Sequence, residues 1–161
     1  HRVSSAAEAA EVLKKILEQN PQGSALAQES ELIESVLNAD SSLSSRVKRL
    51  DNQSVMPSTG MASFDVGITA ADCLVARTGS VVLRCTSTGG RRLSVLPAHH
   101  IVLARKEQLV ASLEEALPSI QKDPDWSFST LITGPSRTAD IEKILVLGAH
   151  GPKRLTVILI G

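Results

Sequence analysis

The sequence predicts an α/β fold in which a mostly parallel sheet carries helices on both faces. Short, continuous apolar runs such as residues 101–104 and 155–160 have the composition of strands buried on both sides. These runs alternate with segments whose apolar residues recur at helical spacing, and strands that alternate with helices form parallel sheets. A chain of 161 residues has the length of one domain, so we expect a single domain over residues 1–161.

The first part of the chain predicts two helices and two short strands. Ser5 followed by Glu8 is a capping-box pattern, and an apolar stripe follows it (Val12, Leu13, Ile16 and Leu17). Residues 24–27 and 46–50 have the composition of strands, and a second helical stripe lies between them (Leu32, Ile33, Val36 and Leu37). Residues 51–64 are polar and irregular, which predicts a loop that is either mobile or a lid over a ligand.

The second part predicts a hairpin, strands and two further helices. Residues 73–76 and 81–85 are rich in β-formers and flank a Thr-Gly turn, which indicates a hairpin or a bent strand. After the strand at 101–104 we expect a helix over 107–117 with buried apolar positions, ended by proline (Leu109, Val110, Leu113 and Leu117). A strand at 128–132 follows, and then a helix that ends at Gly148 before the final strand.

The start of that last helix predicts an anion site. Ser136 or Thr138 is placed to cap it, and Asp140 would lie in its first turn as a supporting charge. Free backbone N–H groups at a helix start, with Arg137 beside them, bind carboxylates or phosphates. We therefore predict that Gly134, Ser136, Arg137 and Thr138 bind a ligand.

A facing wall is predicted from Thr78, Gly79 and Ser80, which follow a strand in the same half of the chain. The simpler explanation of Gly79 is a backbone position with positive φ, and the alternative is that its missing side chain lets a ligand approach the backbone. A second hydroxyl- and glycine-rich segment at 86–92 ends in Arg91 and Arg92, which would support anion binding through guanidinium groups. A solvated basic loop would show the same pattern, and the segment is not a Walker A loop.

Charge is segregated along the chain although the net charge is zero. Residues 73–106 contain no Asp or Glu but several cations (Arg77, Arg84, Arg91, Arg92, Arg105 and Lys106). If this cationic segment folds beside Arg137, its field favours an anion at the mouth of the sheet.

The titratable residues suggest limited chemistry. His150 is the best proton-transfer candidate because the ordinary pKa of histidine is near neutral, although an exposed loop histidine without a function fits equally well. Asp72 would orient or cap the turn opposite. The adjacent residues His99 and His100 point to opposite sides of an extended segment, so they cannot chelate one metal together, and we expect them to be structural.

Composition excludes several classes of function. Cys73 and Cys85 lack the close spacing of metal or iron–sulfur ligands, so we expect reduced core thiols and no metal site. Aromatic residues make up only 2% of the chain, which argues against single-stranded nucleic acid as a partner. The run 155–160 is too short to span a membrane. A cytoplasmic protein is the default expectation.

Five blocks together resemble the LUD domain, the family of lactate-utilisation protein C (LutC or YkgG). They are Gly67-Ile68-Thr69-Ala70-Ala71-Asp72, Thr78-Gly79-Ser80, Leu96-Pro97-Ala98-His99-His100-Ile101-Val102, Gly134-Pro135-Ser136-Arg137-Thr138-Ala139-Asp140-Ile141-Glu142 and Leu147-Gly148-Ala149-His150-Gly151-Pro152. The resemblance is specific over 64–161, the motif-bearing core, and only general in layout over 1–63. Family members usually begin further upstream, which leaves a longer natural N-terminus open.

The resemblance implies the fold of NagB, RpiA and CoA-transferase-like proteins. It also implies a role in oxidising L-lactate to pyruvate, with an iron–sulfur LutB-like subunit and a Cys-rich LutA-like subunit as partners. This chain would bind a small anionic metabolite or support the iron–sulfur partner, and it would hold no cofactor itself. The alternative is an independent enzyme or sensor for a sugar phosphate, an acyl-CoA or a folate. Arg77 stands where the family usually has Glu, which removes a candidate carboxylate base.

Overall fold

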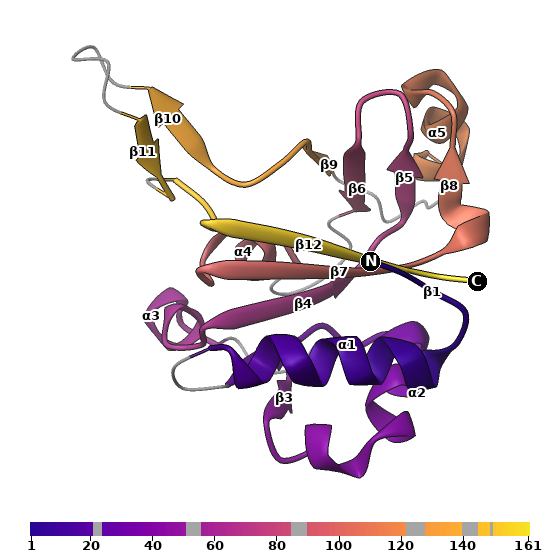
Figure 1. Cartoon of the computed structure of the whole chain (residues 1–161). Coiled ribbons are helices and arrows are strands. Elements are labelled where there is room, and N and C mark those ends of the chain that lie inside the picture. Colours follow the sequence, from indigo (N-terminus) through magenta and orange to yellow (C-terminus); the bar gives the residue numbers. More distant parts are fainter. Residues whose placement is uncertain (21–23, 51–55, 85–89, 122–127, 140–144, 149) are drawn as a thin grey trace.

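A computed structural model of the chain describes residues 1–20, 24–50, 56–84, 90–121, 128–139, 145–148 and 150–161. Its larger sheet has six strands in the order β1-β12-β7-β4-β2-β3 (Figure 1). In chain order these are Arg2–Val3 (β1), Ala25–Ala27 (β2), Val47–Arg49 (β3), Val66–Ala70 (β4), His99–Arg105 (β7) and Arg154–Ile160 (β12). Every pairing in this sheet is parallel, so the carboxyl ends of its strands share one edge and the amino ends share the other. The predicted α/β fold with a mostly parallel sheet is confirmed.

Helices α1 (Ala6–Glu18) and α2 (Glu31–Ala39) cover one face of the parallel sheet. Ser5 Oγ caps α1 by accepting the Glu8 backbone N–H at 3.2 Å, as the sequence predicted. The Glu8 carboxylate, however, accepts from the backbone N–H and the hydroxyl of Ser4, both at 2.8 Å, and not from Ser5. Both predicted apolar stripes pack against the sheet, and the largest side chains of this core are fully buried (Leu13, Leu17, Ile33, Leu37, Ile68, Ile101, Leu103 and Ile158).

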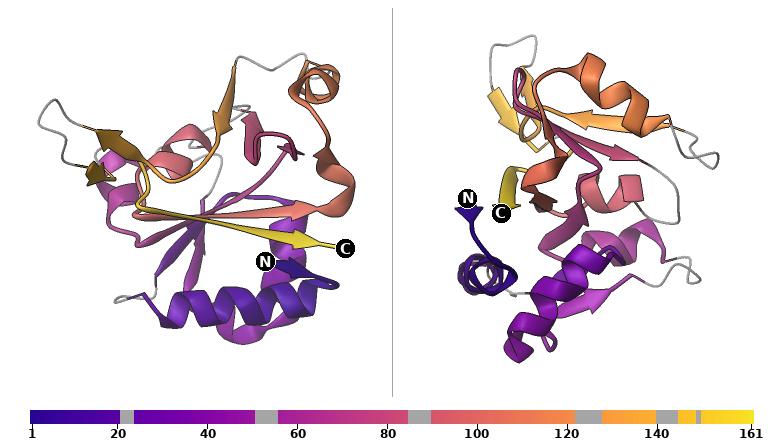
Figure 2. Two further views of the ribbon diagram at one scale, coloured as in Figure 1. Left: turned by 45° about the horizontal axis from the view of Figure 1, so that its top comes forward. Right: turned by 90° about the vertical axis from the view of Figure 1, so that its right-hand side faces the viewer.

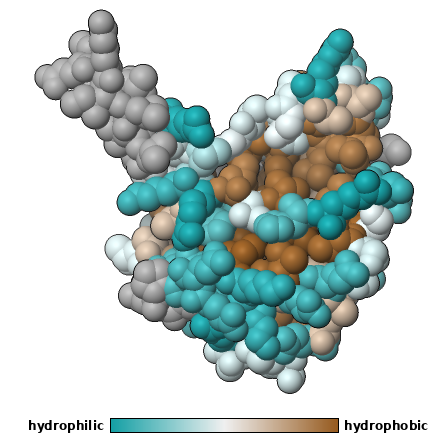
Figure 3. All heavy atoms as spheres, in the orientation of Figure 1, coloured by the Kyte–Doolittle hydropathy of each residue, from teal (hydrophilic) through white to brown (hydrophobic). Residues whose placement is uncertain are grey.

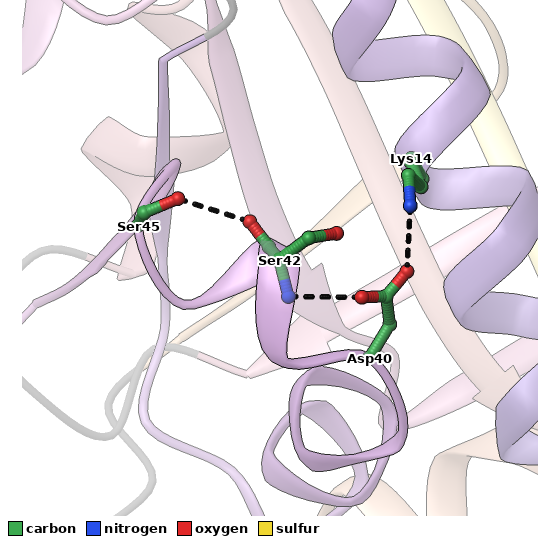
Figure 4. A network of polar contacts seen from close by, with 4 residues as sticks. All are labelled: Lys14, Asp40, Ser42 and Ser45. Atoms are coloured by element: carbon green, nitrogen blue, oxygen red, sulfur yellow. Dashed lines mark hydrogen bonds and ion pairs between the residues drawn. The ribbon is translucent and has the colours of Figure 1, made fainter.

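A short polar network joins α1 to the end of α2 (Figure 4). Asp40 caps the 3₁₀ turn η1 (Ser41–Leu43) by accepting the Ser42 backbone N–H at 2.9 Å, and it also receives the ammonium of Lys14 at 3.2 Å. Hydrogen bonds from Ser42, together with Lys14, lower the pKa of Asp40 to about 2. The turn after α2 is therefore held against the middle of α1.

A second, mixed sheet covers part of the opposite face (Figure 2). Its order is β8-β5-β6-β9, from Cys73–Val75 (β5), Ser80–Arg84 (β6), Leu109–Val110 (β8) and Ser129–Ile132 (β9). The antiparallel pairing of β5 with β6 confirms the predicted hairpin. Leu74, Val81 and Leu83 pack on Val102 and Ala104 of the parallel sheet, and α5 (Leu113–Ile120) packs on the outer side of the small sheet. One covering layer is thus a sheet where helices were expected.

Two short helices that the sequence did not predict cover the rest of this face. They are α3 (Ser58–Ala62), inside the expected loop at 51–64, and α4 (Gly90–Val95), which includes the end of the expected anion-binding segment. Leu93 of α4 packs with Leu26 and Met61. Gly67 of β4 allows this contact, because a Cβ at Gly67 would lie 2.4 Å from the Leu93 carbonyl oxygen. Residues 51–55 and 85–89, including Cys85, lie outside the described residues.

The prediction of one helix over 107–117 is wrong for its first half. The chain forms the 3₁₀ turn η2 (Lys106–Gln108) and strand β8 before α5 begins at Leu113, and Pro118 lies within α5. Three positions expected to be buried are exposed: Leu109 by 43%, Leu113 by 36% and Leu117 by 44%. The backbone of β8 pairs with β5 instead, and this tertiary pairing overrides the local helical spacing.

The prediction of a helix after Ser136 is also wrong. Arg137–Ala139 (β10) pairs antiparallel with Leu145–Leu147 (β11), with Arg137 opposite Leu147, so no helix starts at Ser136 or Thr138. This hairpin projects beside the amino ends of β7 and β12 (Figure 1). The turn at 140–144, which contains Asp140, lies outside the described residues.

The surface is polar over the outer face of α1 and apolar above it, between the two sheets (Figure 3). Leu155, Val157 and Leu159 of β12 contribute half-buried side chains to the cluster between the sheets. Among the helices that the structure describes, none combines the length and apolarity needed to cross a membrane.

Candidate functional site

A polar cleft of about 320 Å³ opens at the carboxyl edge of the parallel sheet, where β2, β4 and β7 end. Ligands of open α/β sheets bind at this edge, because the loops and helix starts that follow parallel strands converge there. The residues that line the carboxyl-edge cleft follow β2 (Gln28, Glu29, Ser30 and Leu32), end or follow β4 (Ala70, Ala71 and Asp72), end or follow β7 (Arg105 and Gln108) or end β6 (Arg84).

One wall of the cleft is built on the pair of Asp72 and Arg84. One oxygen of the Asp72 carboxylate accepts the Arg84 backbone N–H at 2.6 Å, and the other accepts Arg84 Nε at 2.7 Å. The side chains are 25% and 27% exposed, so the pair is only partly screened by water. Two hydrogen bonds to one carboxylate fix the direction of the Arg84 guanidinium at the edge of the cleft.

Gln108 ties the ends of two neighbouring strands together. Its Nε2 donates to the Ala71 carbonyl at 2.5 Å, and its Oε1 accepts the Arg105 backbone N–H at 2.6 Å. The residue before Asp72 and the residue that ends β7 are therefore held by one side chain. This clamp places the exposed cation Arg105 at the same cleft as Arg84.

The opposite wall is the start of α2. Ser30 is the N-cap residue, but its hydroxyl makes no capping hydrogen bond. The start of this nine-residue helix, with Ser30 and Leu32, lines the same cleft as the two arginines. Glu29 adds a carboxylate, so the cleft combines cations, an acid, amides and a hydroxyl, which suits a small molecule bearing both a carboxylate and neutral polar groups.

The amino edge of the sheet has a different character, because it carries the two adjacent histidines at the start of β7. His99 Nε2 lies 2.9 Å from Thr156 Oγ1, and His100 Nε2 lies 2.8 Å from Thr69 Oγ1. Burial, together with Arg154, lowers the pKa of His99 to about 4, and burial, together with His99, lowers the pKa of His100 to about 3. Both rings are thus neutral near pH 7, and each leaves its Nδ1 buried without a hydrogen-bond partner.

The blocks at 96–100, 134–138 and 147–152 converge at this same edge. The Ala98 carbonyl accepts the backbone N–H groups of Lys153 and Arg154, at 2.8 and 3.2 Å. Ser136 donates its N–H to the Pro152 carbonyl at 2.9 Å and accepts the Gly148 N–H at 3.0 Å. Ser136 is therefore joined to the turn that contains His150.

The predicted facing wall at 78–80 contacts Thr133, the residue directly before the 134–138 block. Ser80 Oγ lies 2.8 Å from Thr133 Oγ1 and 2.7 Å from Thr78 Oγ1. Gly79 has a φ of 64° with no atom near its missing Cβ, which agrees with the turn explanation. Gly79 and Ser80 also line an apolar pocket of about 180 Å³ between the hairpin and β12.

The other predicted residues lie on several different elements and turns. Gly134 has a φ of 142° directly after Thr133, and Arg137 and His150 are exposed. The Arg92 guanidinium faces the Met56 carbonyl at 3.5 Å, on the side of α3. Thr138 lies in β10 and Arg91 in α4, but their side chains are outside what the structure describes. Ligand binding by these residues and proton transfer by His150 stay predictions.

Among the predicted site residues that the structure describes, Asp72 alone lines the carboxyl-edge cleft. Two cations of the segment 73–106, Arg84 and Arg105, join it there, whereas Arg77 lies exposed at the tip of the β5–β6 hairpin. The wall formed by residues 28–30 was not predicted from the sequence. A signal for it was present, because a predicted buried strand at 24–27 is followed by Gln-Glu-Ser and a predicted helix, which is the strand-to-helix connection that binds ligands.

The described residues contain no group of three or more His, Cys, Asp or Glu side chains placed to hold a metal ion. Cys73 is buried, and burial, with the nearby Asp72 charge, raises the pKa of its thiol. A buried, protonated thiol is a poor nucleophile, so Cys73 is best understood as part of the core.

Comparisons with known proteins agree with this architecture. The model of the LUD domain family matches residues 1–160. A lactate utilization protein C of Oceanobacillus iheyensis is 37% identical over 101 residues, which cover 60% of this chain and 43% of that protein. A protein of the same name from Macrococcus caseolyticus is 40% identical over 102 residues, covering 60% of this chain and 44% of the relative. The region matched by this chain thus spans less than half the length of each of these curated relatives.

Among solved structures, a crystal structure of a DUF162 family protein from Deinococcus radiodurans is similar with a TM-score of 0.70. The two share 22% identity, and the similarity covers all of this chain and 87% of that one. At this identity the likeness establishes the fold alone.

Proposed function

Because the chain belongs to the LUD domain family, we propose that it acts as a LutC-like component of an L-lactate utilisation system and binds a small anionic metabolite in its carboxyl-edge cleft. The observation that carries the binding role is the pairing of Arg84 and Arg105 with the start of α2 across one cleft. L-lactate or pyruvate would place its carboxylate on the arginines. The neighbouring oxygen would meet Ser30 or Gln28.

Three physical features support this binding role. Arg84 is held in direction by Asp72 before any ligand arrives, which reduces the entropy lost on binding. Arg105 is exposed, so its guanidinium is open to an incoming anion. The α2 N-terminus adds partial positive charge on the other side of the cleft.

The test is calorimetric titration of the protein with L-lactate and with pyruvate. We expect Arg105→Gln to weaken binding about tenfold, the loss of one charge-assisted hydrogen bond. Lys48→Gln is the matched control, because Lys48 is an exposed cation on β3 that does not line the cleft. Equal affinities for Arg105→Gln and the parent would contradict the placement of the ligand.

A second candidate is an independent enzyme or sensor for a larger anionic metabolite, such as a sugar phosphate, an acyl-CoA or a folate. The mixed lining of the cleft favours it, because the Glu29 carboxylate offers a polar contact that a three-carbon acid would not use. A thermal-shift screen of these compounds beside lactate and pyruvate separates the two candidates, since a bound ligand raises the melting temperature.

The partners expected for a LutC-like component are an iron–sulfur LutB-like subunit and a Cys-rich LutA-like subunit. Any electron transfer would run through these partners. Affinity purification of the tagged protein from a native extract is expected to retain both. If neither subunit is recovered, ligand binding, which the calorimetric titration tests separately, remains as the support for a function of this chain.

A further inference from the structure

We propose that a second, separate pocket at the amino edge of the parallel sheet binds the oxyanion head group of a carboxylate or phosphate compound. The pocket has a volume of about 430 Å³. Its lining comes from the start of β7 (His99), the start of β12 with the residue before it (Lys153, Arg154, Leu155 and Thr156), the end of α1 (Ile16 and Gln19), and His1 and Pro135. We call it the amino-edge pocket.

The charge of the amino-edge pocket selects for an anion. Lys153 and Arg154 are exposed cations that follow one another in the wall, and none of the described residues that line the pocket is acidic. Arg154 donates one N–H to Asn20 Oδ1 at the end of α1, which offsets the negative carbonyl end of that helix. A guanidinium has five N–H donors, so further donors remain for a ligand.

His99 supplies a second, independent indication. Its side chain belongs to a residue that is only 4% exposed, and its Nδ1 has no hydrogen-bond partner although it is buried. If Thr156 donates its hydroxyl proton to Nε2, the neutral ring carries its proton on Nδ1 and needs an acceptor. A buried hydrogen-bonding group without a partner destabilises the protein, and a small shift of the ring toward an anion in the pocket would supply that partner.

The surrounding backbone holds the basic residues in place. Ala98, directly before His99, accepts the backbone N–H groups of both Lys153 and Arg154, so the backbones of the three residues that define the pocket are joined at one peptide group. Pro135, next to the hydrogen-bonded Ser136, closes another side. Pro135 thus brings the 134–138 block, which the sequence predicted to bind an anion, into the wall of the amino-edge pocket. It does so without the helix that the prediction assumed.

The experiment is a titration of the whole chain with inorganic phosphate and, separately, with acetate, followed by long-range ¹H–¹⁵N spectra of the imidazole nitrogens. The four histidines are assigned by single substitutions. We expect the His99 Nδ1 resonance to shift with saturation while His100 Nδ1, on the other side of β7, stays unchanged. The anion that gives the lower Kd identifies the head group.

Lys153→Gln is the first variant, because Lys153 is exposed and its loss leaves the core intact. It is expected to raise the Kd about tenfold, and Lys48→Gln is expected to leave it unchanged. The inference is overturned if neither anion moves His99 Nδ1, or if Lys153→Gln responds like the parent. Arg105→Gln keeps the His99 response in either case, so failure here is distinguishable from failure of the carboxyl-edge cleft.

Discussion

The two edges of the parallel sheet are built from the same strands but differ in how their polar groups are paired. At the carboxyl edge, the charges are balanced and paired, as in Asp72 with Arg84, and the polar side chains are tied by hydrogen bonds. At the amino edge, cations stand without acids in the pocket wall, and two buried imidazoles each leave one nitrogen unpaired. The polar side chains described at the carboxyl edge are thus held by hydrogen bonds within the protein, whereas each buried histidine of the amino edge keeps one nitrogen without a partner.

The largest difference between the edges is expected in the pH dependence of stability, because both buried histidines lie at the amino edge. Their folded pKa values of about 4 and about 3 lie below the ordinary value of 6.5, so the unfolded state binds protons first as the pH falls. Their contribution is fully present above pH 6.5 and is lost below it. Between pH 6.5 and pH 4.5 the free energy of unfolding should fall, approaching about 1.4 kcal/mol per pH unit for each histidine.

Urea unfolding at several pH values measures this slope. The described carboxylates with lowered pKa values are Glu8, Glu34, Asp40 and Glu114, and their ordinary values are 4.5 or below. Their contribution is lost mainly below pH 4.5, outside this window. His150→Gln is the control, since this side chain is exposed and its removal should keep the slope. A stability that is flat from pH 6.5 to pH 4.5 would show that the rings are hydrated or protonated in the folded protein.

The next largest effect tests the packing beneath the amino edge. Gly67→Ala places a Cβ 2.4 Å from the Leu93 carbonyl and 2.9 Å from Pro97 Cγ, so α4 has to move away from β4. We expect a loss of about 3 kcal/mol, typical of an overpacked core. Gly79→Ala is the comparison variant, because its Cβ meets nothing and only the positive φ is strained. Equal losses in thermal unfolding would refute the packing explanation.

A moderate effect is expected when the paired charges of the carboxyl edge are broken. Asp72→Asn removes the charge that holds Arg84 and weakens the bond to its backbone N–H. Because both side chains are about a quarter exposed, solvent screening limits the loss of stability to about 1–2 kcal/mol. The larger change should be in ligand affinity measured by calorimetry. Unaltered affinity would mean that Arg84 needs no partner to be positioned.

A loss of stability of similar size is expected at the turn behind the amino-edge pocket. Gly148 has a φ of 76°, and a Cβ there would lie 2.5 Å from Lys153 Cγ. Since the stem of Lys153 is flexible, Gly148→Ala should cost only about 1–2 kcal/mol, mainly from the backbone. It should also displace Lys153 and weaken phosphate binding to the amino-edge pocket. A variant that unfolds like the parent but loses the His99 response would sharpen the link between Gly148 and the pocket.

Some features of this protein follow from the sequence alone. The continuous apolar strands, the Ser5 cap of α1 and the stripes of α1 and α2 are local signals, because burial and capping depend on residues near in the chain. They sufficed for the α/β fold and the parallel sheet, and the five blocks sufficed for the LUD family. The acid-free segment between residues 73 and 106, which the sequence predicted to favour an anion, also contains the two cations that line the cleft.

Only the tertiary structure decided where the polar groups meet. The helical spacing after Ser136 was real in the sequence, yet β10 and β11 pair with each other. The helical spacing at Leu109 likewise gave way to pairing between β8 and β5. Hydrogen bonds between strands join residues far apart in the chain, so no local pattern reports them. For the same reason, the contact between Asp72 and Arg84 forms only when the strands are in register. The same holds for the backbone contacts that bring together Ala98, Lys153 and Ser136.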